Sequence, residues 1–224
     1  MDKKCAVKII TDAVKIYDNI YCGRNLLIIF GSPDKPLYIE TAAEEKNFFH
    51  LTGIKLNKTH LLKDISDKNS NVLSIFYLKA KRSRLSVDDF EFKDGSTVQK
   101  LQVLIQTLQI TRNLKMFGDY SEGRINLKTD KLAGSVSSFL GFVKTGRYYV
   151  PNTVMADDIR NNSRQTQRVL AVLSKKTSDL QYDSILSVAK SIDIKRLSGK
   201  IIQSVPIDKS ILNSDDDSQV KSDT

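Results

Sequence analysis

The sequence predicts an α+β fold, in which N-terminal helices and a hairpin pack on an antiparallel sheet of about four or more strands. In the first half of the chain, apolar side chains recur at steps of three and four, the period of a helix. After Asn113, short apolar runs alternate with glycines, a pattern typical of strands and turns. At 224 residues and 40% hydrophobic content, the chain is long enough for one sizeable core.

The N-terminal stretch predicts a helix followed by a hairpin. Apolar residues from Val7 to Tyr21 form one helical face, and Gly23 follows where a helix would end. The apolar runs 26–30 and 37–40 then predict two strands. The residues between these runs, 31–36, are rich in turn formers and predict a loop longer than the tight two-residue type.

Three further helices are predicted by apolar periodicity, over about residues 42–52, 71–84 and the stretch that follows Ser96. Thr41 stands three residues before Glu44, the spacing of a capping box that would begin the first of them. Gly53 would end that helix, so His50 falls in its last turn.

The second half predicts the sheet. Short apolar runs suited to strands lie at residues 114–117, 125–127, 139–143, 147–150, 169–173 and 182–188. A single helical turn is predicted over Asp157 to Asn162. No repeat or linker divides the chain, so we expect one domain over residues 1–207 and an acidic, disordered tail over 208–224.

Charge favours a polyanionic partner. The net charge is +9, and the tail carries five acidic residues against two lysines, which leaves about +12 on residues 1–207. Such an excess suits RNA, DNA or an acidic protein, although lysine-rich codon usage alone also makes proteins basic.

The sequence predicts a reduced, cytoplasmic protein without a membrane segment. No apolar run reaches the length of about 18 residues that a membrane span requires. The N-terminus leads to no apolar signal core. Cys5 and Cys22 lie near opposite ends of one predicted helix, so we expect free thiols.

His50 and Thr52 form the first candidate site. His50 is one of only two histidines, so side chains that exchange protons near neutral pH are few. The negative end of the helix dipole is expected to raise its pKa, which suits a general acid. Thr52 could hydrogen-bond a phosphate oxygen. A histidine that merely caps the helix has the same position, so a structural role stays open.

A second candidate lies at residues 147–153, Arg-Tyr-Tyr-Val-Pro-Asn-Thr. Strand alternation sends Tyr148 and Tyr149 to opposite faces, so one would join the core and the other could stack on a base. Asn152 and Thr153 would lie at a strand end, a common place for binding groups. An ordinary loop with its own backbone bonds is the alternative.

Other catalytic patterns are weak or missing. The sequence has no phosphate-binding glycine loop, Cys-x-x-Cys pair or His-Glu-x-x-His motif, and we expect neither metal nor cofactor. Asp89, Glu91 and Lys93 loosely resemble the acidic triplet of metal-dependent nucleases, but no second acidic site is evident.

Several of these motifs occur in the order of one known family. They are Phe48-Phe49-His50-Leu51-Thr52-Gly53, Asp88-Asp89-Phe90-Glu91-Phe92, Lys115-Met116-Phe117-Gly118-Asp119-Tyr120, Leu140-Gly141-Phe142-Val143 and Tyr148-Tyr149-Val150-Pro151-Asn152-Thr153-Val154. Over about residues 5–195 the chain resembles the fourth type of phage-borne barnase–EndoU–colicin–RelE-like nuclease domains. The acidic tail lies outside this resemblance.

The resemblance implies a metal-independent ribonuclease, a toxin or anti-phage effector, on helices packed against a four-stranded antiparallel sheet. The catalytic residues that it implies are His50, Thr52, Tyr149, Asn152, Thr153 and Arg160. The expected substrate-binding residues are Lys55, Arg147, Tyr148 and Arg164. The expected partners are RNA (tRNA, mRNA or rRNA) and an antitoxin or inhibitor protein. A non-catalytic module that binds nucleic acid or protein is the competing interpretation.

Overall fold

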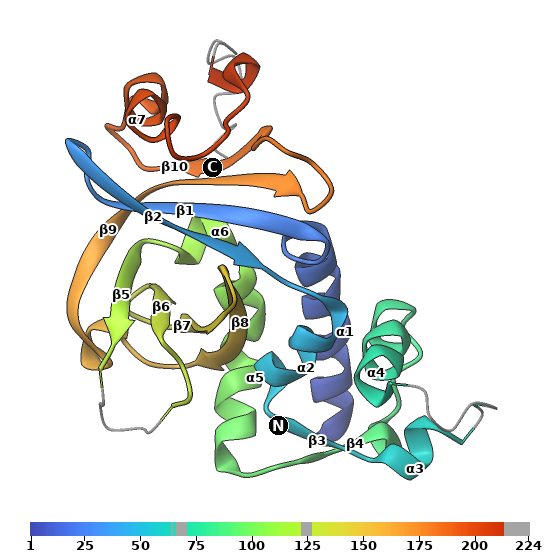
Figure 1. The fold of residues 1–224 in the computed structure, drawn as a ribbon. Coiled ribbons are helices and arrows are strands. Elements are labelled where there is room, and N and C mark those ends of the chain that lie inside the picture. The colour runs from blue at the N-terminus through green and yellow to red at the C-terminus, as the bar shows by residue number, and fades with distance from the viewer. Residues whose placement is uncertain (64, 66–70, 122–126, 213–224) are drawn as a thin grey trace, which may run out of the picture.

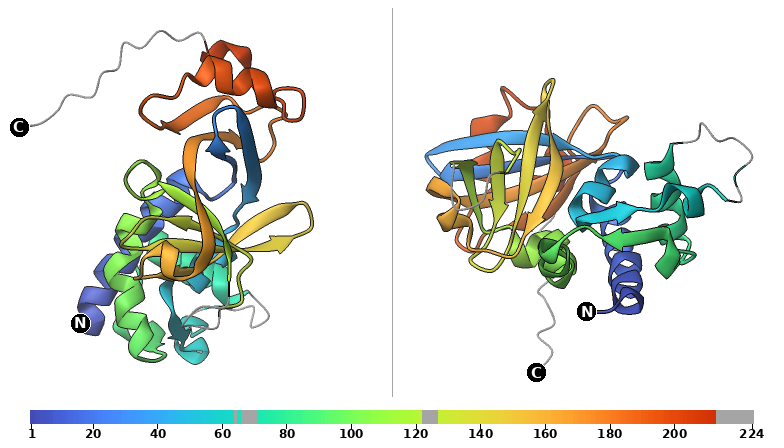
Figure 2. Two further views of the ribbon diagram at one scale, coloured as in Figure 1. Left: turned by 90° about the vertical axis from the view of Figure 1, so that its left-hand side faces the viewer. Right: turned by 90° about the horizontal axis from the view of Figure 1, so that it is seen from below.

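A helical part and a strand part make up the protein (Figure 1). The structure is a computed structural model that describes residues 1–63, 65, 71–121 and 127–212. Seen from below in Figure 2, the strand part lies beside helices α1 (Lys3–Ile20) and α4 (Val72–Lys81). Of the predicted disordered tail over 208–224, residues 208–212 are described and include the 3-10 turn Lys209–Leu212, whereas the residues from 213 fall outside the described ranges. Most of the predicted strand at 125–127 falls outside them too. Within those ranges, no helix is both long and apolar enough to cross a membrane.

Helix α1 confirms the first predicted helix. Asp2 caps it, since its carboxylate accepts from the backbone N–H of Cys5 at 2.7 Å. Its apolar face is buried, and Gly23 follows the helix with a φ of +69°. The position of Gly23 therefore marked the end of this helix correctly.

The predicted hairpin is present as β1 (Arg24–Ser32) and β2 (Lys35–Ala42). The longer loop that we expected is wrong, because Ser32 pairs with Lys35 and only Pro33 and Asp34 remain between the strands. Gly31 has a φ of +99°, a conformation that glycine adopts without steric cost.

Helix α2 (Glu45–Thr52) begins later than the predicted capping box implied. Thr41 lies buried in β2 instead. The cap is Glu44, whose backbone N–H donates to Oδ1 of Asn47 at 2.8 Å. Gly53, with a φ of +69°, ends the helix as expected.

The remaining helices are mostly short. They are α3 (Lys58–Leu61), α5 (Gly95–Leu108), α6 (Ile110–Asn113), α7 (Ile194–Ile201) and the 3-10 turns η1 (Val87–Asp89), η2 (Ile159–Asn161) and η3 (Lys209–Leu212). Helices α4 and α5 confirm two predictions, and η2 confirms the predicted helical turn. Strands β3 (Ile54–Leu56) and β4 (Phe90–Phe92) pair as a small antiparallel sheet beside α2 and α5.

The main sheet closes into a barrel, which corrects the predicted antiparallel sheet. Its further strands are β5 (Met116–Tyr120), β6 (Lys131–Gly134), β7 (Phe139–Thr145), β8 (Tyr148–Met155), β9 (Ser163–Lys176) and β10 (Ser184–Val188). The order is β1-β2-β8-β7-β6-β5-β9-β10, and β9 also pairs with β1. Seven strands therefore form a ring. One contact in this ring is parallel, where Thr41 of β2 meets Tyr149 of β8.

The long strand β9 is the physical reason for closure. It has 14 residues, and its two halves pair with β5 and with β1. The ladder with β1 is irregular where Ile29 faces Ala171 and Phe30 faces Val169. The extra residue lets the strand bend between its two partners. Apolar periodicity predicts where strands occur, but it does not predict that one strand pairs with two neighbouring strands.

The core continues from the barrel interior into the helices. Leu26, Ile28 and Phe30 of β1 belong to one buried cluster with Val172 of β9 and Tyr17 of α1. The opposite face of β1 and β9 belongs to a second cluster, covered by α7. The helices are thereby fixed rigidly against the barrel wall, and α2 and α5 both contact β8.

Candidate functional site

His50 lies where α2 ends, on an exposed position. Its ring packs edge-on against Phe49, with ring centroids 5.4 Å apart. Because α2 contacts both α5 and β8, the end of this helix faces a junction of three elements. Chemistry at His50 therefore depends on what α5 and β8 place beside it.

Lys100 of α5 connects these three elements. A Cβ at position 53 would lie only 2.8 Å from Cδ of Lys100, so the lysine side chain passes directly over Gly53. Beyond that glycine, its Nζ donates a hydrogen bond to Oγ1 of Thr153 on β8 at 3.0 Å. The missing side chain at Gly53 thus makes room for the lysine that links α5 to the barrel.

The structure contradicts the prediction that the pKa of His50 is raised. Although the residue is exposed overall, partial burial of its ring and then the positive charge of Lys100 lower the pKa of His50 below its ordinary value of 6.5. His50 is accordingly neutral at pH 7, the form that accepts a proton.

Lys100 is itself perturbed. Burial lowers its pKa most, Lys93 lowers it further, and Asp94 opposes both effects. A half-buried ammonium with a lowered pKa is a stronger proton donor than a solvated lysine. It also brings positive charge to within reach of His50.

Thr153 is held in place by its surroundings. Its side chain is buried, and a Cβ at Gly141 of the paired strand would lie 2.7 Å from its Cγ2 atom. The methyl group is thus fixed against β7, while the hydroxyl accepts from Lys100. Thr153 orients the ammonium group.

Three other expected catalytic residues have structural contacts. Thr52 is fully buried, and its hydroxyl donates to the carbonyl of Phe49 at 2.7 Å. Asn152 is the extra residue of a β-bulge in β8, and its Nδ2 donates to the carbonyl of Lys128 at 2.8 Å. Tyr149 is half-buried against the main core. The structure gathers His50 and Thr153 around Lys100.

Arg160 has different neighbours. Its guanidinium binds the carboxylate of Asp158, with the closest contact at 2.6 Å. It belongs to η2, which contacts β6 and β9, whereas α2 contacts β8 and α5. Arg160 and His50 therefore have separate surroundings in the fold.

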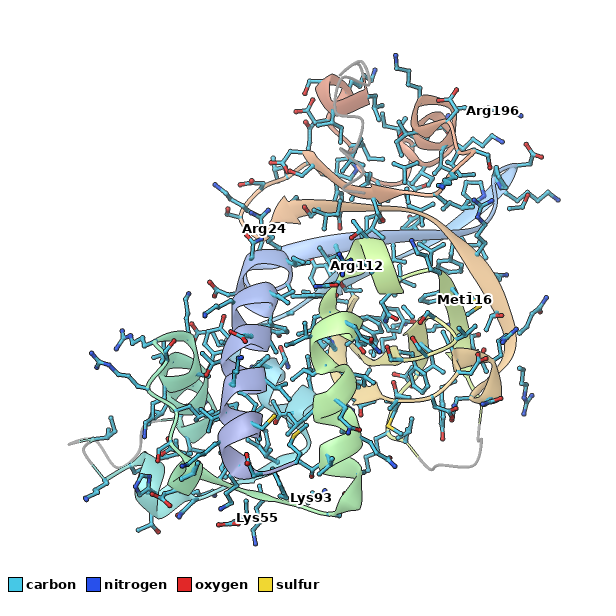
Figure 3. All side chains as sticks on the ribbon, turned by 180° about the vertical axis from the view of Figure 1, so that it is seen from behind. Arg24, Lys55, Lys93, Arg112, Met116 and Arg196 are labelled. Atoms are coloured by element: carbon cyan, nitrogen blue, oxygen red, sulfur yellow. The ribbon has the colours of Figure 1, made fainter. Side chains whose placement is uncertain are left out.

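The expected substrate-binding residues are spread over the surface. Lys55 is exposed on β3, and Figure 3 shows it at the same end of the molecule as Lys93. Arg147 stacks on Tyr148, with its guanidinium carbon 4.5 Å from the ring centroid. Arg164 is the second residue of β9 and lines a cavity of the barrel. Only Lys55 lies near the end of α2, since β3 directly follows Gly53.

The two acidic residues of the triplet that resembles a metal-dependent nuclease site, Asp89 and Glu91, make contacts that stabilise the fold. Asp89 is fully buried, and its Oδ1 accepts from Lys79 at 2.7 Å and pairs with Nδ1 of His60 at 2.8 Å. Glu91 binds Lys3 at 2.8 Å. In the part of the chain that the structure describes, no three His, Cys, Asp or Glu side chains are grouped so that they could hold a metal ion.

Comparison with known proteins identifies a family to which the sequence is similar. Residues 9–191 match the family described as phage-Barnase-EndoU-ColicinE5/D-RelE like nuclease 4. The chain belongs to this family. The resemblance seen in the sequence motifs is thereby confirmed, and family membership supports a nuclease function. No curated protein and no solved structure matched the chain.

The sequence interpretation missed Lys100. A signal was present, because Lys100 lies one turn from Leu104 and beside Leu101, at the margin of the apolar face of α5. A lysine at the margin of an apolar face has its stem covered by neighbours, which favours a defined partner. That partner is 53 residues away in sequence, so only the fold identifies it.

Proposed function

We propose that this nuclease-family protein is a metal-independent ribonuclease, a phage-borne toxin or anti-phage effector, that acts at His50, Lys100 and Thr153. The observation that carries the proposal is the ammonium of Lys100, held 3.0 Å from Oγ1 of Thr153 and close enough to His50 to lower its pKa. A neutral imidazole beside a fixed cation is the pairing that cleavage at a ribose 2′-hydroxyl requires.

In this mechanism His50 takes the proton of the 2′-hydroxyl. The 2′-oxygen forms a bond to phosphorus, and the bond from phosphorus to the 5′-oxygen breaks. Lys100 neutralises charge on the phosphorane and gives a proton to the departing 5′-oxygen. The products are a 2′,3′-cyclic phosphate and a free 5′-hydroxyl. His50 returns its proton to water and Lys100 regains one.

The other expected residues have supporting roles in the proposal. Thr153 orients Lys100, and Thr52 shapes the end of α2. Tyr149 and Asn152 hold the β8 backbone that carries Thr153. The RNA backbone outside the reacting phosphate contacts the remaining basic and aromatic side chains, Lys55, Arg147, Tyr148, Arg160 and Arg164.

The test is incubation of purified protein with RNA and with DNA in EDTA. We expect cleavage of RNA alone, with a 2′,3′-cyclic phosphate at the new end, and at least about a hundredfold slower cleavage by His50→Ala. Phe49→Leu at the neighbouring position keeps both proposed catalytic groups and serves as the control. Inhibition by EDTA would contradict the metal-independent mechanism.

The competing function is a non-catalytic module that binds nucleic acid or protein. It predicts that RNA stays intact and that His50→Ala has no effect on growth when the protein is expressed in cells. The proposed toxin predicts the opposite: growth inhibition that His50→Ala relieves. Sequencing of the cyclic-phosphate ends would show whether tRNA, mRNA or rRNA is cut, and co-purification would reveal an inhibitor protein.

A further inference from the structure

The barrel contains a cavity that is separate from the candidate site at the end of α2. It is a cavity of about 1150 Å³ bounded by β1, β2, β5, β6 and β9. Its lining includes Phe30, Leu37 and Phe117, and no residue of α2, α5 or β8. Figure 1 shows these strands arranged around the interior of the barrel. The proposed catalytic residues do not use this space.

The inward-facing side chains change character along the strands that line the cavity. On β5, buried Phe117 is followed two residues later by exposed Asp119, on the same face of the strand. On β6, buried Ala133 is likewise preceded by Lys131. The interior is therefore apolar at depth and polar at its mouth, the composition of a ligand site in a barrel.

Several polar groups at the mouth have no partner of their own. In the described ranges, the side chains of Arg164, Gln165 and Gln167 make no hydrogen bond or ion pair. Gln167 is only half-exposed, so its amide faces restricted space rather than open solvent. Lys131 pairs with Asp119, so among the described residues of the lining the positive charge of Arg164 is the one left uncompensated.

Apolar surface is available beside these polar groups. Leu37 at the rim is 52% exposed, so its side chain is accessible to a ligand. Beneath it, the rings of Phe30 and Phe117 stack with centroids 3.9 Å apart. The cavity thus offers the exposed side chain of Leu37 beside two largely buried aromatic rings, two free amides and a cation.

We propose that this cavity binds nucleotide units through their bases and phosphates. The ring of a base would lie against Leu37 and the aromatic floor, the glutamine amides would bond its polar edge, and Arg164 would bind a phosphate. The choice of nucleotides as ligand rests on the proposed function. Binding cavities commonly measure about 300–1,000 Å³, so this one has room for more than one nucleotide and suits single-stranded RNA.

The experiment uses the full chain carrying His50→Ala, which leaves bound RNA uncut. Binding of a fluorescein-labelled single-stranded RNA hexamer is measured by anisotropy, with and without Arg164→Ala and Gln167→Leu. We expect each cavity substitution to weaken binding about tenfold, the effect of losing one charged or buried hydrogen bond. Arg82→Ala removes the same charge from the end of α4, an element that does not line the cavity, and should change binding less than twofold.

Free nucleoside monophosphates show whether the cavity binds free nucleotides or nucleotides within an RNA chain. If they displace the hexamer and their own binding depends on Arg164 and Gln167, the ligand is a free nucleotide. If they do not compete, the site takes nucleotides within an RNA chain. Hexamer binding that is unchanged by both cavity substitutions, or no binding of either ligand, overturns the inference.

Failure of this inference is distinguishable from failure of the proposed function. Cavity-dependent binding by a protein that cuts no RNA would retain the cavity site and reject the ribonuclease. Cleavage that depends on His50, together with binding that ignores Arg164 and Gln167, would do the reverse. Thermal unfolding of each variant verifies that the substituted protein is folded, which we expect because these side chains have no partners to lose.

Discussion

Gly53 serves the candidate site in two ways that can be separated by mutation. Its φ of +69° favours glycine, and its missing Cβ leaves space for Lys100. Gly23 has the same φ of +69°, but a Cβ there would meet nothing within 4 Å. These two glycines are therefore a matched pair in which one has a crowded neighbour and the other does not.

We predict that Gly23→Ala lowers the free energy of unfolding by about 1 kcal/mol, the cost of a left-handed alanine. Gly53→Ala should cost more, because it adds a 2.8 Å contact with Lys100, and it should also displace Nζ from Thr153. Urea unfolding measures the first effect and RNA cleavage the second. Equal stability loss and equal cleavage by the two variants would show that Lys100 moves aside freely.

The pKa of His50 gives a second test at this scale. Lys100 lowers that pKa, so Lys100→Met should raise it toward the ordinary value of 6.5. An NMR titration of the His50 ring measures the pKa directly. In the unsubstituted protein, cleavage should rise with pH as His50 loses its proton and level off at a pH below that of an ordinary histidine.

Lys8→Met is the control for this titration, because Lys8 is exposed on α1 and does not contribute to the pKa of His50. It should leave the titration of His50 where it is. The same shift in both variants would mean that overall charge, rather than the neighbouring ammonium, sets the pKa.

At the scale of elements, Asp89 joins three pieces of the helical part. Its carboxylate binds Lys79 of α4, His60 of α3 and the backbone N–H of Ser86 before η1. Burial acts to raise the pKa of Asp89, but these bonds prevail and lower it below 3.8. A carboxylate with this many partners stabilises the fold.

We predict that Asp89→Asn lowers the free energy of unfolding by about 2 kcal/mol or more, since the half-buried ammonium of Lys79 loses its counter-ion at a fully buried position. Because the folded pKa is depressed, the stabilising effect of Asp89 should be present above about pH 4 and lost as pH falls toward the folded pKa. Asp88→Asn, at the exposed neighbour, should have little effect in the same urea titrations. A purely catalytic loss without destabilisation would instead favour the acidic-triplet interpretation.

Apolar spacing over a short stretch of sequence predicted the helices and strands that form within that stretch. Helices α1, α4 and α5 and strands β1 and β2 follow from apolar spacing. The short amphipathic helix α7 was missed, although Ile194, Leu197 and Ile201 have helical spacing, because Gly199 interrupts it within eight residues. The tight turn after Ser32 was missed because strand pairing continues through residues that also favour loops.

At the scale of the whole molecule, the sequence could not show which strands meet. Closure of the barrel depends on β9 pairing with β1 across 139 to 152 residues, and the parallel contact of β2 with β8 spans over 100. The Lys100–Thr153 contact is of the same kind. Sequence motifs therefore singled out His50 and Thr153 as candidates, while their common neighbour Lys100 emerged only from the packing of α5 between them.

The excess of positive charge gives a last prediction for the molecule as a whole. Under the proposed function, a chain of net charge +9 binds RNA through lysines and arginines, so its affinity should fall steeply as salt rises. For single strands, the logarithm of the binding constant falls with that of the salt concentration, with a slope of about −0.7 for each phosphate contacted. Removing one contacting cation should therefore flatten the slope by about 0.7.

We expect that flattening from Lys55→Ala, measured in the His50→Ala protein with a single-stranded RNA long enough to extend from the end of α2 along β3. Lys8→Ala removes an equal charge from exposed surface of α1 and should leave the slope unchanged, since it alters net charge without removing a contacted phosphate. If both substitutions flatten the slope equally, the RNA responds to overall charge, and Lys55 is not part of a defined track leading to His50.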